Sequence, residues 1–163
     1  MIVLGIDPGI AITGFGVVRV EQNRHIVLGY GAIRTSSQET TARRLEAIYG
    51  GLSKLIAEFE PDCLAVEELF FNKNSASAMQ VGQARGVAIL AGTHAGLPVF
   101  EYTPLQVKTA VTGYGRAAKE QVAYMVCTLL GLENPPQPDD VTDALAICIC
   151  HGYNANNWGR RER

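Results

Sequence analysis

The chain has 163 residues, of which 47% are hydrophobic and 18% charged, and its formal net charge is −2 at pH 7. This length and composition are typical of one globular domain, and the sequence contains no internal repeat and no low-complexity block. No apolar run approaches the roughly 18 residues that a membrane helix needs, and the first residues show no signal-peptide pattern. We therefore expect a cytoplasmic protein with no membrane partner.

The first third of the chain predicts three consecutive strands, at 1–7, 13–20 and 24–35. A Pro-Gly turn at 8–9 and a polar turn at 21–23 join them, and such short connections favour an antiparallel meander.

The remaining elements alternate between helix and strand. The apolar spacing predicts a helix over 41–59, a strand over 63–66, a polar loop over 72–77 with a helix continuing to His94, a strand over 98–102, and helices over 105–111, 119–130 and 139–151. This order favours an α/β domain whose central five-stranded mixed sheet combines the meander with two helix-linked strands, flanked by helices. We expect a single domain over 1–155 and a short, basic, disordered tail over 156–163.

Acidic residues occur in three apolar settings. Carboxylates resist burial unless they are paired, hydrogen-bonded or bound to a cation, so three such clusters favour a divalent metal site. The clusters comprise Asp7, Glu67 with Glu68, and Asp139, Asp140 and Asp143.

The spacing of these acids limits how they can act. Asp140 and Asp143 lie three residues apart on a predicted helix and face the same direction, whereas Asp139 fits an N-terminal cap equally well. Successive strand residues face opposite sides, so only one of Glu67 and Glu68 faces the site, and the local pattern leaves open which. Carboxylates suit Mg²⁺ or Mn²⁺, and two ions roughly 3.5–4 Å apart can stabilise both the attacking and leaving oxygens of phosphodiester hydrolysis.

The charge balance changes when these clusters are set aside. Without their six acids, 10 acidic residues remain against 14 lysines and arginines, so the rest of the chain is basic. A basic surround attracts phosphates without regard to sequence, although an ordinary acidic surface remains the alternative.

The cysteines and histidines carry no metal signal of their own. The four cysteines lie in apolar stretches without C-x-x-C spacing and are predicted to be reduced core residues. His151, about 12 Å along the predicted helix from Asp143, is predicted to be a hydrogen-bonded interior histidine.

Several segments, in order along nearly the whole chain, are similar to those of one known family. These are GIDPG, TGFGVV, AVEELF, NKNSASAMQVGQARGVAI, PVFEYTPLQVK, AAKEQV and DVTDALAICICH. Together they resemble the RuvC family of bacterial Holliday-junction resolvases, which are endonucleases with the ribonuclease-H-like fold. The resemblance implies a structure-selective endodeoxyribonuclease that resolves Holliday junctions by paired symmetric nicks in homologous recombination and DNA repair.

The resemblance also assigns roles to particular residues and partners. It implies that Asp7, Glu67, Asp140 and Asp143 are both catalytic and metal-ligating, with two Mg²⁺ ions per active site for which Mn²⁺ can substitute. In a branch of the family histidine stands at the position of Asp140. The implied partners are four-way junction DNA, a second copy of the chain, and a RuvA-RuvB branch-migration complex.

Two further surfaces are predicted, and the resemblance bears on both. The DNA-binding residues are predicted to be Phe70, Phe71, Lys73, Lys108, Arg116 and Lys119. A symmetric homodimer is predicted because two nicks need two sites, with an interface on the helix that carries Met79, Gly82, Gly86, Ile89 and Leu90.

Three alternatives stay open from the sequence. GIDPGIAITG also resembles the first phosphate loop of actin-like ATPases and sugar kinases, but these need a second lobe for which one domain has no room. A pre-ribosomal-RNA nuclease shares the glycine-aspartate start but is not expected to carry the NKNSAS and QARGVAI segments. The third alternative is a catalytically inactive junction-binding protein.

Overall fold

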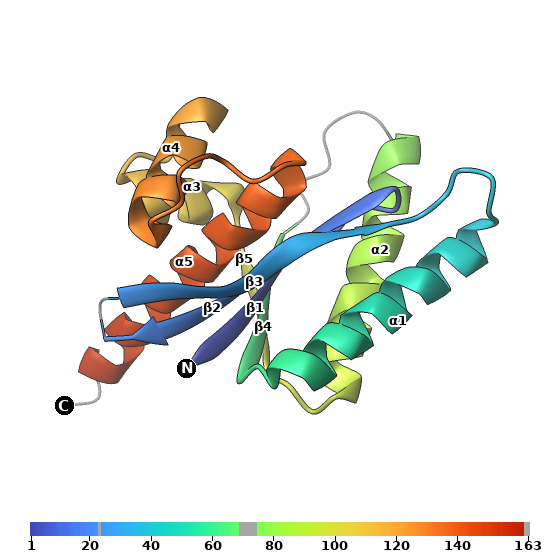
Figure 1. The fold of residues 1–163 in the computed structure, drawn as a ribbon, viewed down its shortest axis with the longest axis horizontal. Helices are drawn as coiled ribbons and strands as arrows, with labels where there is room; N and C mark the ends of the chain where they lie inside the picture. Colours follow the sequence, from blue (N-terminus) through green and yellow to red (C-terminus); the bar gives the residue numbers. More distant parts are fainter. Residues whose placement is uncertain (23, 69–74, 162–163) are drawn as a thin grey trace.

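A five-stranded mixed sheet forms the centre of the computed structural model, which describes residues 1–22, 24–68 and 75–161 (Figure 1). The strands are β1 (Ile2–Asp7), β2 (Ile12–Glu21), β3 (Arg24–Arg34), β4 (Cys63–Glu67) and β5 (Val99–Tyr102). Their spatial order is β3-β2-β1-β4-β5, with antiparallel pairing from β3 to β1 and parallel pairing from β1 to β5. The predicted sheet is thus confirmed.

Helices cover both faces of this sheet (Figure 1). They are α1 (Thr41–Phe59), α2 (Ser75–His94), α3 (Pro104–Thr112), α4 (Lys119–Leu130) and α5 (Asp139–Arg161). α1 and α2 lie on one face, and α3, α4 and α5 lie on the other. Because strand side chains alternate, Leu4 and Ile6 of β1 pack toward α1 and α2, whereas Val3 packs toward α5. Within the described part of the chain, no helix is long and apolar enough to cross a membrane.

Local hydrogen bonds explain several helix boundaries. The Thr40 side chain accepts a hydrogen bond from the Arg43 amide at the start of α1, and Thr103 and Gln106 form a reciprocal capping box at the start of α3. α3 ends at Gly113 and α4 ends at Gly131. Both residues adopt the left-handed conformation, which glycine reaches easily because it has no Cβ.

Two predicted helix limits were wrong. α2 begins at Ser75, inside the segment predicted to be a loop, and α5 continues to Arg161 instead of ending near His151. Two contacts support α5 beyond His151. Tyr153 packs against the core, and the Asn154 side chain donates a hydrogen bond to the Cys150 carbonyl. Residues 156–161, which the prediction assigned to the C-terminal tail, form the last part of this helix.

Glycine residues in β1 and β2 allow α5 to lie directly against the sheet, because they have no side chain. A Cβ added at Gly5 would lie 2.4 Å from the Ala144 carbonyl oxygen, and one at Gly14 would lie 2.0 Å from the Asp140 carbonyl oxygen. Both distances are too short for any residue other than glycine. Gly14 is also the cross-strand partner of Asp7. This approach therefore holds the first turn of α5 above the end of β1.

The interior histidine prediction is confirmed. His151 is 3% exposed, and its ring nitrogens lie 2.7 Å from the Tyr102 hydroxyl and 3.2 Å from the Cys63 sulfur. Burial lowers the pKa of His151 to about 4, so the ring is neutral. All four cysteines are buried and free.

Gly14→Ala is expected to lower the free energy of unfolding by about 2–3 kcal/mol, because the new methyl group overlaps the α5 backbone. Gly50→Ala is the matched control: a Cβ there meets nothing within 4 Å, and alanine favours the helix by up to about 1 kcal/mol. Urea unfolding of both variants and the wild-type protein measures the difference. Equal stability of the two variants would show that the close approach is not required.

Candidate active site

Two strand ends bring the first pair of acids together. Asp7 ends β1 and Glu67 ends β4, and these strands are parallel neighbours with Ile6 opposite Val66. Cys63 and Ala65 of β4 pack on the α5 side of the sheet, so the strand alternation places Glu67 on that side, with Asp7. Glu68 follows on the opposite side. In the structure it is therefore Glu67, and not Glu68, whose side of the strand faces Asp7, a choice that the local sequence pattern left open.

The start of α5 brings the second pair. Asp140 and Asp143 lie in its first two turns, next to the end of β1. Two hydrogen bonds fix the preceding segment, from the Thr142 hydroxyl to the Pro136 carbonyl at 3.0 Å and from the Val141 amide to the Pro138 carbonyl at 2.9 Å. Asp139, exposed in the first turn, is placed to complement the helix dipole.

Burial and neighbouring carboxylates raise the pKa of three acids at this site, Asp7, Glu67 and Asp143. The pKa of Asp7 rises from 3.8 to about 7, first because the carboxyl is buried and then because Asp143, Asp140 and Glu67 are close. Burial, followed by the charge of Asp143, also raises the pKa of Glu67. The pKa of Asp143 is raised mainly by burial. Negative charge is therefore incompletely compensated at this edge of the sheet.

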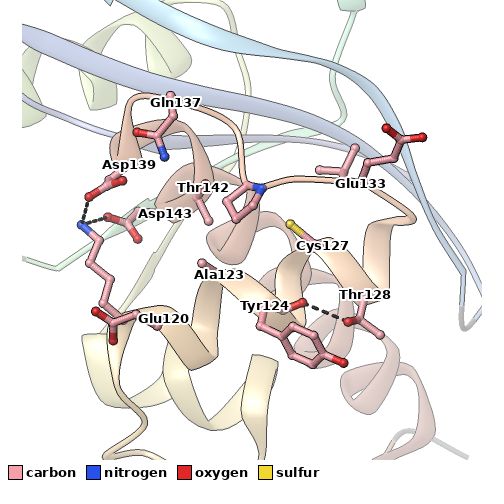
Figure 2. A pocket seen from close by; sticks show the side chains of 13 residues that line it. Glu120, Ala123, Tyr124, Cys127, Thr128, Glu133, Gln137, Asp139, Thr142 and Asp143 are labelled. Carbon is pink, nitrogen blue, oxygen red and sulfur yellow. Dashed lines mark hydrogen bonds and ion pairs between the residues drawn. The ribbon is translucent and has the colours of Figure 1, made fainter.

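Two lysines approach the same acids. The Lys119 ammonium lies 3.1 Å from an Asp139 carboxylate oxygen and 3.4 Å from one of Asp143 (Figure 2). Lys108 acts on Glu67 from α3, where its charge lowers the pKa of that carboxyl against the larger effect of burial. A cavity of about 190 Å³ is lined by Glu67, Asp143, Lys108 and Lys119, together with apolar side chains. Carboxylates and ammonium groups thus meet around one small space.

The donor set fits a divalent cation. Among residues 1–22, 24–68 and 75–161, no three His, Cys, Asp or Glu side chains are gathered tightly enough to hold an ion as they stand. The residue types and electrostatics nevertheless match, because burial and three neighbouring carboxylates raise the pKa of Asp7 and a hard cation would reverse that effect. In this arrangement Lys119 supplies part of the positive charge.

A residue that the sequence did not single out fixes the end of β4. Arg85 of α2 donates a hydrogen bond from Nε to the Glu67 carbonyl at 3.0 Å, and its guanidinium also pairs with Glu101 of β5. Arg85 therefore positions the backbone of Glu67. The available signal was one arginine in an otherwise uncharged stretch, VGQARGVAI.

The predicted DNA-binding residues are only partly placed. Lys108 and Lys119 border the acids, and Arg116 is exposed between α3 and α4. Phe70, Phe71 and Lys73 lie outside the described residues.

Comparison with known proteins assigns this arrangement to a family. A family model described as crossover junction endodeoxyribonuclease RuvC matches residues 3–151. The chain belongs to the RuvC family. RuvC from Moorella thermoacetica is 56% identical over 163 residues, covering 100% of this chain and 97% of that protein. RuvC from Desulforamulus reducens is 54% identical over 161 residues, covering 99% of each.

A solved RuvC structure has the same fold. The structure of Thermus thermophilus RuvC in complex with Holliday junction substrate matches with a TM-score of 0.91 at 42% identity, covering 96% of this chain and 95% of that one. The similarity includes the sheet and the flanking helices. The ribonuclease-H-like fold that the sequence predicted is thus confirmed.

The raised pKa of Asp7 makes the metal-free protein sensitive to pH. Between about pH 4 and pH 7 the folded state holds a proton that the unfolded state releases, so stability falls as pH rises through this window. Asp7→Asn removes this cost and should raise the free energy of unfolding at pH 8 by up to about 4 kcal/mol, with a smaller gain at pH 5. Urea unfolding in a chelator tests this. An identical effect at both pH values would contradict it.

Proposed function

We propose that this protein is a structure-selective endodeoxyribonuclease that resolves Holliday junctions by paired symmetric nicks, acting in the cytoplasm in homologous recombination and DNA repair. The observation that carries the proposal is the meeting of Asp7, Glu67, Asp140 and Asp143 at one sheet edge of a RuvC-family fold. Family membership favours this reading over a pre-ribosomal-RNA nuclease, and the solved relative in complex with Holliday junction substrate supports the choice of DNA.

We propose that the four acids hold two Mg²⁺ ions, for which Mn²⁺ can substitute. Bound ions of this kind activate the attacking water and stabilise the leaving oxygen of the phosphodiester. Asp7, more deeply buried than Glu67 and Asp143, must lose its proton to act as a ligand, so metal affinity should rise with pH up to about 7 and level off above it.

The lysines are proposed to hold the scissile phosphate. Lys119 is more than half exposed at the start of α4, so its long side chain can turn from Asp143 toward a phosphate oxygen. Lys108 borders the same cavity from α3. Arg116 and Lys73 are proposed to contact phosphates further along the strand, and Phe70 and Phe71 to stack on bases unpaired at the crossover.

We further propose a symmetric homodimer, because one active site makes one nick and resolution needs two. α2 buries Ala84 and Ala88 against its own core but leaves Met79 67% exposed and Leu90 57% exposed. Gly82 and Gly86 on this helix permit close approach, and a Cβ at Gly86 would meet nothing within 4 Å. The partly buried Ile89 packs against the core beside this face. As the family resemblance implies, the dimer would act with a RuvA-RuvB complex.

Asp7→Asn and Glu67→Gln should each reduce Mg²⁺-dependent cleavage of a synthetic four-way junction by at least about 100-fold, because each removes ligand charge. Both variants should still bind the junction. Glu68→Gln, on the opposite strand face, is the matched control and should cleave at close to the wild-type rate. End-labelled products should carry 5′-phosphate and 3′-hydroxyl ends.

Three outcomes of this assay would reject the proposal. Junction binding by the wild-type protein without nicking would favour the inactive binding protein. Preferential cleavage of RNA would favour the pre-ribosomal-RNA nuclease. Loss of cleavage in Glu68→Gln but not in Glu67→Gln would show that the opposite strand face carries the chemistry.

Leu90→Glu should convert the dimer to a monomer, because it places a charge on the proposed contact face of α2. Leu105→Glu on α3 is the matched control, since Leu105 is 61% exposed but lies away from α2. Sedimentation equilibrium at micromolar concentration measures both. A monomeric wild-type protein, or a dimer that persists in Leu90→Glu, would rule out this interface.

A further inference from the structure

A second, larger hollow opens beside the active site. It has a volume of about 470 Å³, within the range of roughly 300–1,000 Å³ for pockets that bind small ligands. α4 forms one wall with Ala123, Tyr124 and Cys127, and the start of α5 with the segment before it forms the other (Figure 2). Its lining is mainly apolar, and apart from Lys119, Asp139 and Asp143 its lining residues have no catalytic or binding role assigned above.

We propose that this hollow binds one unstacked nucleobase of the junction strand whose phosphate lies in the active site, and that it favours a base with an exocyclic amino group. This inference rests on the proposed nuclease function and adds a specificity subsite to it.

The hollow adjoins the catalytic cavity. Lys119 and Asp143 line both spaces, and Asp139, which pairs with Lys119, also lines the larger one. A strand that places a phosphate against Lys119 therefore carries the adjoining base to the mouth of the hollow.

The apolar wall offers a stacking surface. Tyr124 is 69% exposed, and it lines both this hollow and the neighbouring one of about 410 Å³. Stacking of a base on an aromatic ring is worth about 1–3 kcal/mol and is available to any base. Tyr124 therefore supplies affinity, and the polar rim must supply selectivity.

The rim is chemically suited to a base and not to the phosphate backbone. Glu120, Glu133 and Gln137 line it, and Lys119 at the mouth is the one cation among the described lining residues. Carboxylates repel phosphates but accept hydrogen bonds from amino groups such as N4 of cytosine, and a glutamine can pair with adenine. Thymine offers no amino group, so it is expected to be disfavoured.

The test uses Tyr124→Ala with two matched variants. Tyr124→Phe keeps the ring, and Tyr114→Ala removes another exposed tyrosine, which borders the neighbouring hollow of about 410 Å³ but not this one. Junctions carry 2-aminopurine, which has an exocyclic amino group, at one position at a time on either side of the scissile phosphate. Fluorescence is read with Ca²⁺ in place of Mg²⁺, and cleavage with Mg²⁺ is then compared between thymine and amino-bearing bases.

At one position next to the scissile phosphate, the wild-type protein should quench 2-aminopurine, and Tyr124→Ala should lose this quenching. Tyr124→Ala should also cut the cleavage rate for the preferred base at that position about tenfold, the size of one stacking contact. Tyr124→Phe and Tyr114→Ala should both behave as the wild-type protein. Circular dichroism confirms that the variants are folded.

Other outcomes overturn the inference. Wild-type quenching that persists in Tyr124→Ala, or is lost equally in Tyr114→Ala, would show that the base does not enter this hollow. Unchanged junction behaviour combined with weakened binding of an arginine-rich peptide would assign the hollow to a basic protein partner. A wild-type protein that neither binds nor nicks the junction would instead reject the proposed function itself, so the two failures are distinct.

Discussion

The contact between α5 and the sheet is the constraint on which the acidic site depends. Gly5 and Gly14 leave space that the backbone of α5 occupies directly, at distances that no side chain would permit. An ordinary helix-on-sheet layer, separated by side chains, would hold Asp140 and Asp143 several ångströms further from Asp7. The glycines at the start of the chain therefore act on function through packing, without touching a ligand.

This packing concentrates like charges, which cost stability in the absence of a cation. Burial and three neighbouring carboxylates raise the pKa of Asp7 to about 7. Lys119 reduces the repulsion between the carboxylates by pairing with Asp139 and Asp143. The helix dipole at the start of α5 also stabilises negative charge there. The electrostatics of the site therefore favour a bound cation, and the ammonium group of Lys119 compensates part of the negative charge without one.

The sequence predicted the sheet, most helices and the acids because these follow periodicities that short segments carry. Asp7 and Glu67 end apolar strands, and this pattern is visible locally. Other features could not be predicted because they depend on which segments lie close together in space. Which side of the sheet Glu67 faces matters only once the side on which α5 packs is known, and the contact of Lys119 with Asp139 joins residues twenty positions apart in sequence. The extension of α5 beyond His151 was missed because its stabilising contacts, through Tyr153, are tertiary. Arg85 was visible in the sequence only as one arginine in an uncharged stretch, and the hollow beside α4 depends on contacts between segments that the sequence does not place together.

Arg85 has a consequence for the timing of two nicks. Its guanidinium holds the Glu67 carbonyl, and it projects from the same helix whose other side exposes Met79 and Leu90. In the proposed dimer, any shift of α2 at the contact between subunits would displace the hydrogen bond from Arg85 to the Glu67 carbonyl in both copies. The two catalytic centres would then be coupled mechanically through a pair of helices, so that a strained junction held by one subunit could alter the readiness of the other.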